Sequence, residues 1–312
     1  MNLQQLEYIV AVDNYRHFVK ASDACFVTQA TLSTMIKKLE DELQVKIFDR
    51  RKQPVMPTET GKKIIAQAKI VLQQANKIKE IIMEEKGEVK GLLRIGVIPT
   101  LAPYLLPLFI NNILRKYPLL KLKISELTTD EIIHKLEYHH LDAALLATPL
   151  GKSFLIEQPI FYEQFVVYAS SNEKLMSKKY LLAKDIDVNR LWLLEEGHCL
   201  RSQVVNLCEL KNREKELHQL DFEAGSIETL KKIVEANQGI TILPELAVEG
   251  LTLKQKNNLR YFKSPAPARE ISLVTYQYFT KSNLIEVLRK EILQNIPEEM
   301  KSLKKKEVIE SQ

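Results

Sequence analysis

Residues 28–40 decide the fold of the amino-terminal part of the chain, and they read Thr28-Gln29-Ala30-Thr31-Leu32-Ser33-Thr34-Met35-Ile36-Lys37-Lys38-Leu39-Glu40. Thr28 is a favourable N-cap, and the apolar residues Leu32, Ile36 and Leu39 recur at the spacing of one helical face. The other faces carry amides, hydroxyls and lysines, which are the groups that pair with base edges and phosphates. Because another helix at 18–24 and a tight turn at 25–27 precede this one, the sequence predicts a helix-turn-helix.

Three consecutive cations, Arg50, Arg51 and Lys52, follow this helix just before Pro54. They indicate a wing or hairpin that lies along the DNA backbone. The sequence therefore predicts a winged helix-turn-helix domain over residues 1–57. For any one of these cations taken alone, a solvated surface charge is the more common alternative.

Residues 58–86 predict one long helix that is capped by Thr58. Its apolar positions follow a 3.5-residue repeat, and they are Ile64, Ala68, Val71, Ala75, Ile78 and Ile82. A stripe this narrow is typical of a coiled-coil seam, so we expect two copies of the chain to dimerise through this helix. The alternative is packing against the helix's own domain, for which a wider apolar face is expected.

A charged, glycine-bounded hinge at 87–91 separates this helix from a region of different pattern. From 92 to 296, apolar strand-like runs alternate with helical segments, which predicts an α/β domain with a mostly parallel sheet covered by helices. The expected strands are 92–98, 119–127, 143–147, 165–169, 191–194, 240–243 and 271–276. The charged tail at 297–312 is expected to be frayed or disordered.

Composition excludes several classes of protein. The 312 residues carry a formal net charge of +5, which is compatible with nucleic-acid binding without being diagnostic of it. Three cysteines do not form a secreted disulfide framework, and neither a signal peptide nor a membrane span is visible, so we expect a cytoplasmic protein. No phosphate-binding loop, dinucleotide fingerprint or zinc motif is found, so we expect no cofactor and no metal.

Two of the three cysteines, Cys199 and Cys208, lie nine residues apart at an expected helix. A thiol at a helix start beside His198 and Arg201 has a lowered pKa, so we expect Cys199 to be a reactive thiolate. An unbroken helix would hold the two backbones about 13 Å apart, and a disulfide needs Cα atoms within about 7 Å. The pair can join only if the helix melts, which would make the bond a conformational switch. Two unrelated core cysteines are the alternative, and this segment alone does not decide between them.

The order of these parts resembles the LysR-type transcriptional regulators. The matching residues near the amino terminus include Leu6, Glu7, Tyr8, Ala21, Ala24, Gln29, Ala30, Thr31, Leu32, Ser33, Ile36, Leu39, Glu40, Leu43, Phe48, Arg50, Thr58 and Gly61. Gly197, His198, Cys199, Leu200, Arg201 and Cys208 match the redox segment of the peroxide-sensing members. The resemblance implies a regulatory domain at 92–296 like periplasmic binding proteins, with one subdomain at 92–161 plus 269–296 and another at 162–268.

The resemblance also implies roles for single residues. Cys199 would be the peroxidatic thiol and Cys208 the resolving thiol. The residues expected around peroxide and the thiolate are Thr100, Thr129, His198, Arg201 and Arg269. Those expected to face DNA bases are Gln29, Thr31, Ser33 and Thr34, and those expected near phosphates are Lys37, Lys38, Arg50 and Arg51. Ser202 stands where the family often has an acidic residue, and Asp221 falls where it has a histidine, which puts the tuning of the switch in doubt.

The partners implied are double-stranded DNA, hydrogen peroxide as signal, a second chain bound through 58–86, a tetramer, and RNA polymerase contacted by an activator. A regulator of this type that binds a small organic anion, with idle cysteines, is the first rival. A thiol peroxidase is the second rival, and it gives no reason for residues 28–52. We therefore expect a sensor rather than an enzyme.

Lys37→Ala tests the predicted phosphate contact. The variant should bind any DNA sequence more weakly, and the slope of log affinity against log salt should shrink by about 1, because one phosphate contact is lost. Titration of labelled DNA over a range of salt concentrations measures this. An equal loss of affinity at every salt concentration would argue against a phosphate contact.

Overall fold

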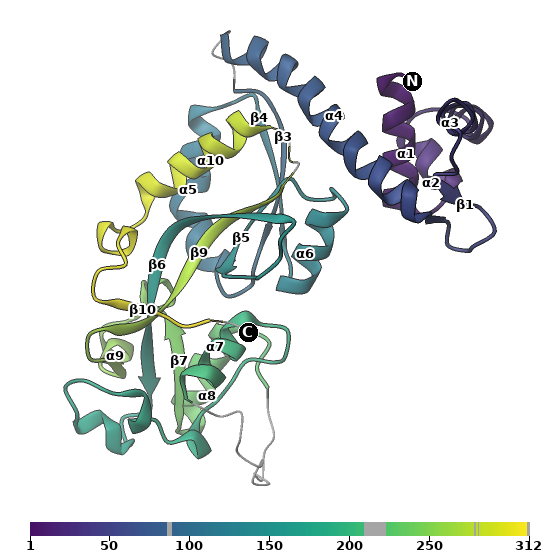
Figure 1. Ribbon diagram of the computed structural model, residues 1–312. Helices are drawn as coiled ribbons and strands as arrows, with labels where there is room; N and C mark the ends of the chain where they lie inside the picture. The colour runs from purple at the N-terminus through teal and green to yellow at the C-terminus, as the bar shows by residue number, and fades with distance from the viewer. Residues whose placement is uncertain (86–88, 209–222, 278, 280, 311–312) are drawn as a thin grey trace. The chain divides into compact units, whose positions relative to one another are not determined.

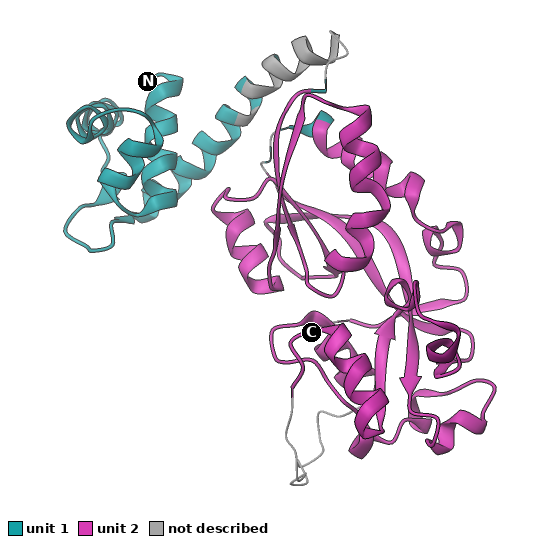
Figure 2. Ribbon diagram, turned by 180° about the vertical axis from the view of Figure 1, so that it is seen from behind, with its two compact units in different colours: residues 1–89, 278–283 teal, residues 90–277, 284–312 magenta. Residues whose placement is uncertain are grey.

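The computed structural model describes residues 1–85, 89–208, 223–277, 279 and 281–310 (Figure 1). The chain divides into two compact units, residues 1–89 with 278–283 and residues 90–277 with 284–312 (Figure 2). Unit 1 has its own hydrophobic core, which includes Ile9, Leu32 and Ile36.

Unit 1 is a winged helix-turn-helix followed by a long helix. Its elements are α1 (Leu3–Tyr15), α2 (Phe18–Ala24), α3 (Gln29–Leu43), β1 (Phe48–Asp49), β2 (Met56–Pro57) and α4 (Glu59–Glu85). The hydroxyl of Thr28 accepts from the Thr31 N–H at 3.2 Å, so α3 begins as the sequence predicts. Strands β1 and β2 pair in antiparallel fashion and confirm the wing.

The long helix α4 uses the first half of its apolar stripe inside unit 1. Ala68 is buried in the unit's core, and Ile64 and Val71 pack against that core. The expectation that the whole stripe serves dimerisation is therefore wrong for its first half, because these side chains pack inside unit 1, where α4 contacts α1 and strand β2 of the wing. Further along, Ile78 is 64% exposed, and the side chain of Ile82 lies outside the described residues.

Unit 2 is built on one mixed sheet in the order β4-β3-β5-β9-β6-β7. The strands are β3 (Gly91–Val97), β4 (Leu120–Glu126), β5 (Ala143–Thr148), β6 (Leu155–Ala169), β7 (Ile240–Pro244), β8 (Leu259–Tyr261), β9 (Ala266–Tyr276) and β10 (Lys306–Val308). β3 pairs in parallel with β4 and β5, whereas β9 and β6 pair antiparallel with each other and with β5 and β7. The expected mostly parallel sheet is thus wrong, because β9 returns to the sheet late in the chain between β5 and β6.

The long strands β6 and β9 connect the two halves of unit 2. The sequence pattern found only 165–169 and 271–276, since polar residues and prolines such as Pro159 and Pro267 interrupt their apolar runs. In the described part of the chain, residues 191–194 form two isolated bridges rather than the expected strand.

Helices cover this sheet. They are α5 (Ala102–Lys116), α6 (Thr129–Glu137), α7 (Cys199–Leu207), α8 (Ile227–Asn237), α9 (Leu253–Lys256) and α10 (Ser282–Asn295). A core cluster of unit 2 joins β6 and β7 to α7 and α8 through residues such as Phe165, Val204 and Leu230. Within the described residues, no helix is both long enough and apolar enough to span a bilayer.

Residues 297–310 of the charged tail are ordered, contrary to the expectation of a frayed or disordered tail. Met300 is buried, and β10 pairs in parallel with β9, with Lys306 opposite Ala266 and Val308 opposite Ala268. Two apolar residues, Val308 and Ile309, give this lysine-rich segment a side that can pack, and Ile309 joins the core cluster of unit 2. The charged composition of the tail gave no sign that these two adjacent apolar residues would pack.

Gly61→Ala should destabilise unit 1. Alanine favours a helix by about 1 kcal/mol over glycine, but a Cβ at this position would lie 2.0 Å from the backbone oxygen of Ile47. The clash should reverse the sign and cost about 1–3 kcal/mol. Hydrogen exchange of the α3 amides reports the stability of this unit.

The matched control is Thr60→Ala, which changes an exposed residue in the same helical turn. It should leave exchange of the α3 amides nearly unchanged. Gly61→Ala protein with wild-type exchange would show that the backbone at Ile47 moves freely.

Candidate functional site

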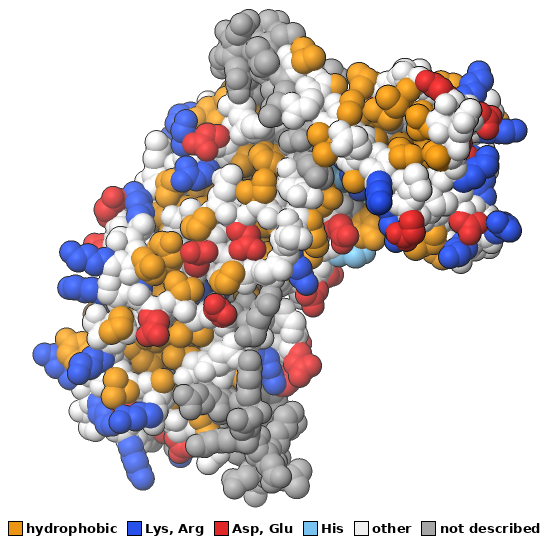
Figure 3. Space-filling model, viewed as in Figure 1, with side chains coloured by type: hydrophobic (Ala, Val, Ile, Leu, Met, Phe, Trp, Pro, Cys, Tyr) orange, Lys and Arg blue, Asp and Glu red, His pale blue; other side chains and the backbone are white. Residues whose placement is uncertain are grey.

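Helix α3 presents a polar face opposite its buried stripe. Leu32, Ile36 and Leu39 are fully buried. Five of the six α3 residues predicted to bind DNA are exposed, and these are Gln29, Thr31, Thr34, Lys37 and Lys38. Lysine and arginine side chains gather at the surface around the α3 and wing end of unit 1 (Figure 3). Hydroxyls, an amide and cations therefore share one accessible surface, as base and phosphate recognition requires.

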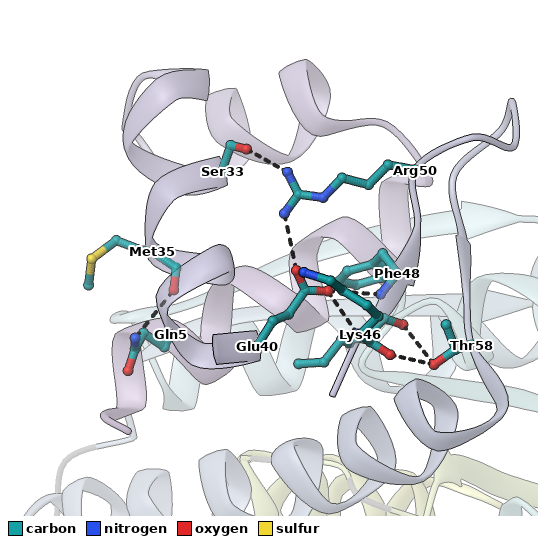
Figure 4. A network of polar contacts seen from close by, with 9 residues as sticks. Gln5, Ser33, Met35, Glu40, Lys46, Phe48, Arg50 and Thr58 are labelled. Atoms are coloured by element: carbon teal, nitrogen blue, oxygen red, sulfur yellow. Dashed lines mark hydrogen bonds and ion pairs between the residues drawn. The ribbon is translucent and has the colours of Figure 1, made fainter. Parts of the chain in front are cut away.

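Arg50 is held by partners inside unit 1 (Figure 4). Its Nη1 donates to the Ser33 Oγ at 2.9 Å, and its Nη2 lies 3.4 Å from the Glu40 carboxylate. The guanidinium also stacks 4.9 Å from the centre of the Phe18 ring. Arg50 and Ser33, which sequence reasoning assigned separately to DNA, are thus bonded to each other.

Glu40 is a residue to which sequence reasoning assigned no structural role. Its side chain is 1% exposed, and its Oε1 accepts from the backbone N–H groups of Ile47 and Phe48 at 2.7 and 3.2 Å. An acidic residue beside the buried stripe of α3 was the available signal.

Arg51 of the wing, by contrast, has 97% of its side chain exposed, and its Nε lies 3.7 Å from the Asp49 carboxylate.

The second site lies where α7 begins in unit 2. Gly197 has a φ of +94°, a conformation that favours glycine, and the chain then turns into a helix whose first residue is the buried Cys199. Cys208 caps the other end, and its N–H donates to the Val204 oxygen at 3.0 Å. Both thiols are free. Because the helix between them is continuous, the backbones of the two cysteines are about 13 Å apart. The two sulfurs therefore cannot form a disulfide in this arrangement.

Burial dominates the titration of both thiols. Burial raises the pKa of Cys199, and it raises the pKa of Cys208 to about 11. The expectation of a lowered pKa at Cys199 is therefore wrong for this state, because desolvation outweighs the groups that favour the thiolate. Among those groups, Arg269 lowers the pKa of Cys199 most, followed by Thr129 and the backbone at Leu200 and Ala147.

Arg269 reaches the thiol site from β9 as part of a fully buried ion pair. Its Nε donates to the Glu163 Oε2 at 2.9 Å, and both side chains are 0% exposed. Its Nη1 donates to the Thr100 Oγ1 at 2.9 Å, and its Nη2 to the Thr100 backbone oxygen at 3.1 Å. Glu163 in turn accepts from the Leu246 N–H at 2.6 Å. The pair joins both long strands to the turn at Thr100 and to the short 3-10 helix Glu245–Val248.

Thr129 supplies a hydroxyl to the same site. It is the first residue of α6, and its buried Oγ1 has no hydrogen-bond partner of ordinary geometry among the described residues. Since it also lowers the pKa of Cys199, this hydroxyl lies close to the sulfur. A buried hydroxyl with unused hydrogen-bonding capacity beside a thiol can hold a small polar molecule there.

The other two predicted supports have different partners. The Nε2 of buried His198 lies 3.6 Å from the Glu195 carboxylate. Arg201 donates to the Leu194 oxygen at 2.6 Å and pairs with Glu223 at 2.8 Å. Arg201 therefore anchors the segment leading into α7, while the cation that acts on the thiol is Arg269.

Glu163 was missed because nothing near it in the sequence points to Arg269, 106 residues away. Within the described ranges, no group of three or more histidines, cysteines and carboxylates could hold a metal ion.

Comparison with known proteins matches both parts of the chain to family models. Residues 3–62 match the bacterial regulatory helix-turn-helix protein of the lysR family, and residues 86–297 match the LysR substrate binding domain. The chain belongs to the LysR family. It is thus a DNA-binding regulator of the kind that the exposed polar face of α3 indicates.

Several proteins of named function are similar to this LysR-family chain over most of its length. The hydrogen peroxide-inducible genes activator of Haemophilus influenzae is 37% identical over 88% of this chain and 90% of its own length. The DNA-binding transcriptional dual regulator OxyR of Escherichia coli K12 is 36% identical over 88% of this chain and 89% of its own. A full-length OxyR variant from Pseudomonas aeruginosa superposes with a TM-score of 0.74 at 34% identity, covering 95% of this chain and 99% of that one.

Arg269→Gln should raise the pKa of Cys199, because it removes the group that lowers this pKa most. Alkylation of Cys199 by iodoacetamide, followed by peptide mass spectrometry, should then require a higher pH. Since the change leaves Glu163 buried without its partner, it should also cost about 3–5 kcal/mol of stability. The double variant Glu163→Gln/Arg269→Gln removes that orphaned charge and should shift the profile in the same direction.

The charge-matched control is Arg260→Gln, in which the lost guanidinium donates to the Met176 backbone oxygen at 2.6 Å. Its alkylation profile should match that of wild type. A wild-type profile in both Arg269 variants would show that the guanidinium does not act on the sulfur.

Proposed function

We propose that this LysR-family regulator senses hydrogen peroxide through Cys199 and responds by forming a reversible Cys199–Cys208 disulfide. The observation that carries the proposal is the buried site itself, in which Arg269 and Thr129 act on the Cys199 thiol and Arg269 is held by Thr100. The relatives named as peroxide-inducible activators support it.

The chemistry needs two steps. The Cys199 thiolate attacks one oxygen of hydrogen peroxide and releases hydroxide, which leaves a sulfenic acid. The Cys208 thiol then attacks that sulfur, the S–S bond forms and water is released. Two thiols of a cellular reductant reverse the oxidation, so each stimulus uses one turnover and the protein acts as a sensor rather than an enzyme.

The residues of the site divide this work. Arg269 favours the small thiolate population that burial would otherwise suppress. The hydroxyl of Thr129, which lies close to the sulfur, and the hydroxyl of Thr100, which already accepts from Arg269, would hold peroxide next to the sulfur. His198 and Arg201 would stabilise the reduced packing around the start of α7 through Glu195 and Glu223.

Transmission to DNA would follow from the loss of α7. A disulfide between its two ends requires the helix to unravel, so the packing around Val204 and Leu200 must change. We propose that residues 1–57 bind double-stranded DNA, that 58–86 pair two chains, and that 92–296 sense peroxide, with 87–91 as hinge. Exposed Ile78 supports pairing through the later part of α4. A tetramer, activation of transcription and contact with RNA polymerase belong to the same proposal.

A rival function is regulation by a small organic anion, with cysteines that take no part. The idle-cysteine alternative predicts that Cys199→Ser leaves regulation intact. A thiol peroxidase would instead show sustained peroxide turnover when a reductant is supplied.

DNA footprinting of the full chain with and without peroxide tests the proposal. Wild type should change its footprint after oxidation, whereas Cys199→Ser should keep the reduced footprint, because no sulfenic acid can form. Cys25→Ser is the matched control, since Cys25 is the third free cysteine and lies half-buried in unit 1. This control should respond like wild type.

An unchanged wild-type footprint after peroxide would refute the switch. So would a full response in Cys199→Ser, which would favour the small-anion rival.

A further inference from the structure

The carboxyl-terminal segment 303–310, here called the strap, lies against the thiol-bearing helix. Its strand β10 runs parallel to β9, and beyond it the Ile309 N–H donates to the Ala268 oxygen at 2.8 Å. The strap is therefore attached to the strand that carries Arg269, one residue further along. Neither the family models, which end at residue 297, nor the proposed chemistry uses this segment.

Two side chains of α7 donate hydrogen bonds to the strap. The Gln203 Nε2 donates to the Ile309 oxygen at 2.9 Å, and the Asn206 Nδ2 donates to the Glu310 oxygen at 2.9 Å. Gln203 is 0% exposed, so the hydrogen bond that its side-chain amide donates is shielded from water. Ile309 also packs against the same core cluster as Leu207 and Cys208.

The other end of the strap is tied down independently of α7. The Lys306 Nζ donates to the Tyr162 oxygen of β6 at 3.0 Å, and to the Glu299 and Ser302 oxygens at 2.6 and 3.1 Å. These bonds and the pairing with β9 do not depend on the helix. The strap can therefore stay in place when α7 unravels. The α7 side chains then lose their hydrogen bonds to the strap.

We propose that the strap is a positioning element that stabilises the thiol form of α7 and so sets how readily Cys199 and Cys208 join; this rests on the proposed function. Gln203 and Asn206 lie inside the segment 199–208 that must leave its helix. Every conformation that brings the two sulfurs together breaks the bonds to Ile309 and Glu310. By linkage, whatever binds the helical form more tightly opposes the disulfide.

Removing the strap should favour oxidation by a measurable factor. One intramolecular hydrogen bond shifts an equilibrium constant by about two- to tenfold, so loss of both bonds and the Ile309 contact should raise the constant for disulfide formation about tenfold or more.

The test equilibrates the full chain in buffers of reduced and oxidised glutathione. In this exchange the two thiols become one disulfide, and glutathione disulfide is reduced to two molecules of glutathione. Quenching by alkylation and peptide mass spectrometry then gives the fraction of chains with Cys199 joined to Cys208. The variants are a truncation after Ser302 and Asn206→Ala, each compared with wild type.

Asn206→Ala separates the strap from the intrinsic stability of the helix. Alanine is the better helix former, so propensity alone predicts a harder oxidation. The strap predicts the opposite, an oxidation about two- to tenfold easier. The matched control is Ser202→Ala, an exposed position on the same helix, where only the propensity effect should be seen. In the truncated chain, the effect of Asn206→Ala should shrink, because the Glu310 oxygen is gone.

Hydrogen exchange of the α7 amides in the reduced protein tests the strap without any disulfide. Truncation should speed this exchange about tenfold or more, while amides of α8 should change little. If no 199–208 disulfide forms in any protein, the proposed function fails and this exchange alone decides on the strap. Unchanged glutathione equilibria together with unchanged α7 exchange in the truncated chain would overturn the proposed role of the strap.

Discussion

The buried pair of Arg269 and Glu163 is the interaction on which the arrangement of unit 2 depends. Two charges with no exposed surface persist only if each is paired and its remaining hydrogen bonds are satisfied, which Thr100 and the Leu246 N–H accomplish here. The pair thereby links the long strands β6 and β9, in which Glu163 and Arg269 lie opposite each other, to the turn at Thr100 and to Leu246. It also fixes the position of Arg269, the group that lowers the pKa of Cys199 most.

The thiol site balances two opposing demands. Burial raises the pKa of Cys199, while Arg269 and Thr129 lower it. The helix imposes a further demand, since its geometry keeps the sulfurs of Cys199 and Cys208 apart as long as the helix is continuous. Reactivity and structural change are thus coupled by the placement of the two cysteines at opposite ends of one short helix.

Local patterns in the sequence predicted much of the fold, and non-local contacts account for what they missed. The helix-turn-helix followed from Thr28 and the spacing of Leu32, Ile36 and Leu39, which are properties of adjacent residues. The antiparallel strand β9, the Glu163–Arg269 pair and the ordered tail join residues that are distant in the chain, and single-sequence periodicity carries no such information. The pKa of Cys199 was predicted in the wrong direction for the same reason, because helix-start position is local and desolvation depends on the whole surrounding fold.

The ordered carboxyl-terminal segment has a practical consequence. Ile309 and Glu310 contact the helix between the two cysteines, so these two residues lie next to the segment that carries both thiols. A fluorophore coupled there would report the state of that helix through its own emission. An affinity tag at the same end would, conversely, disturb the sensor, whereas labels on the exposed outer surface of α5 at Asn111 would leave it alone.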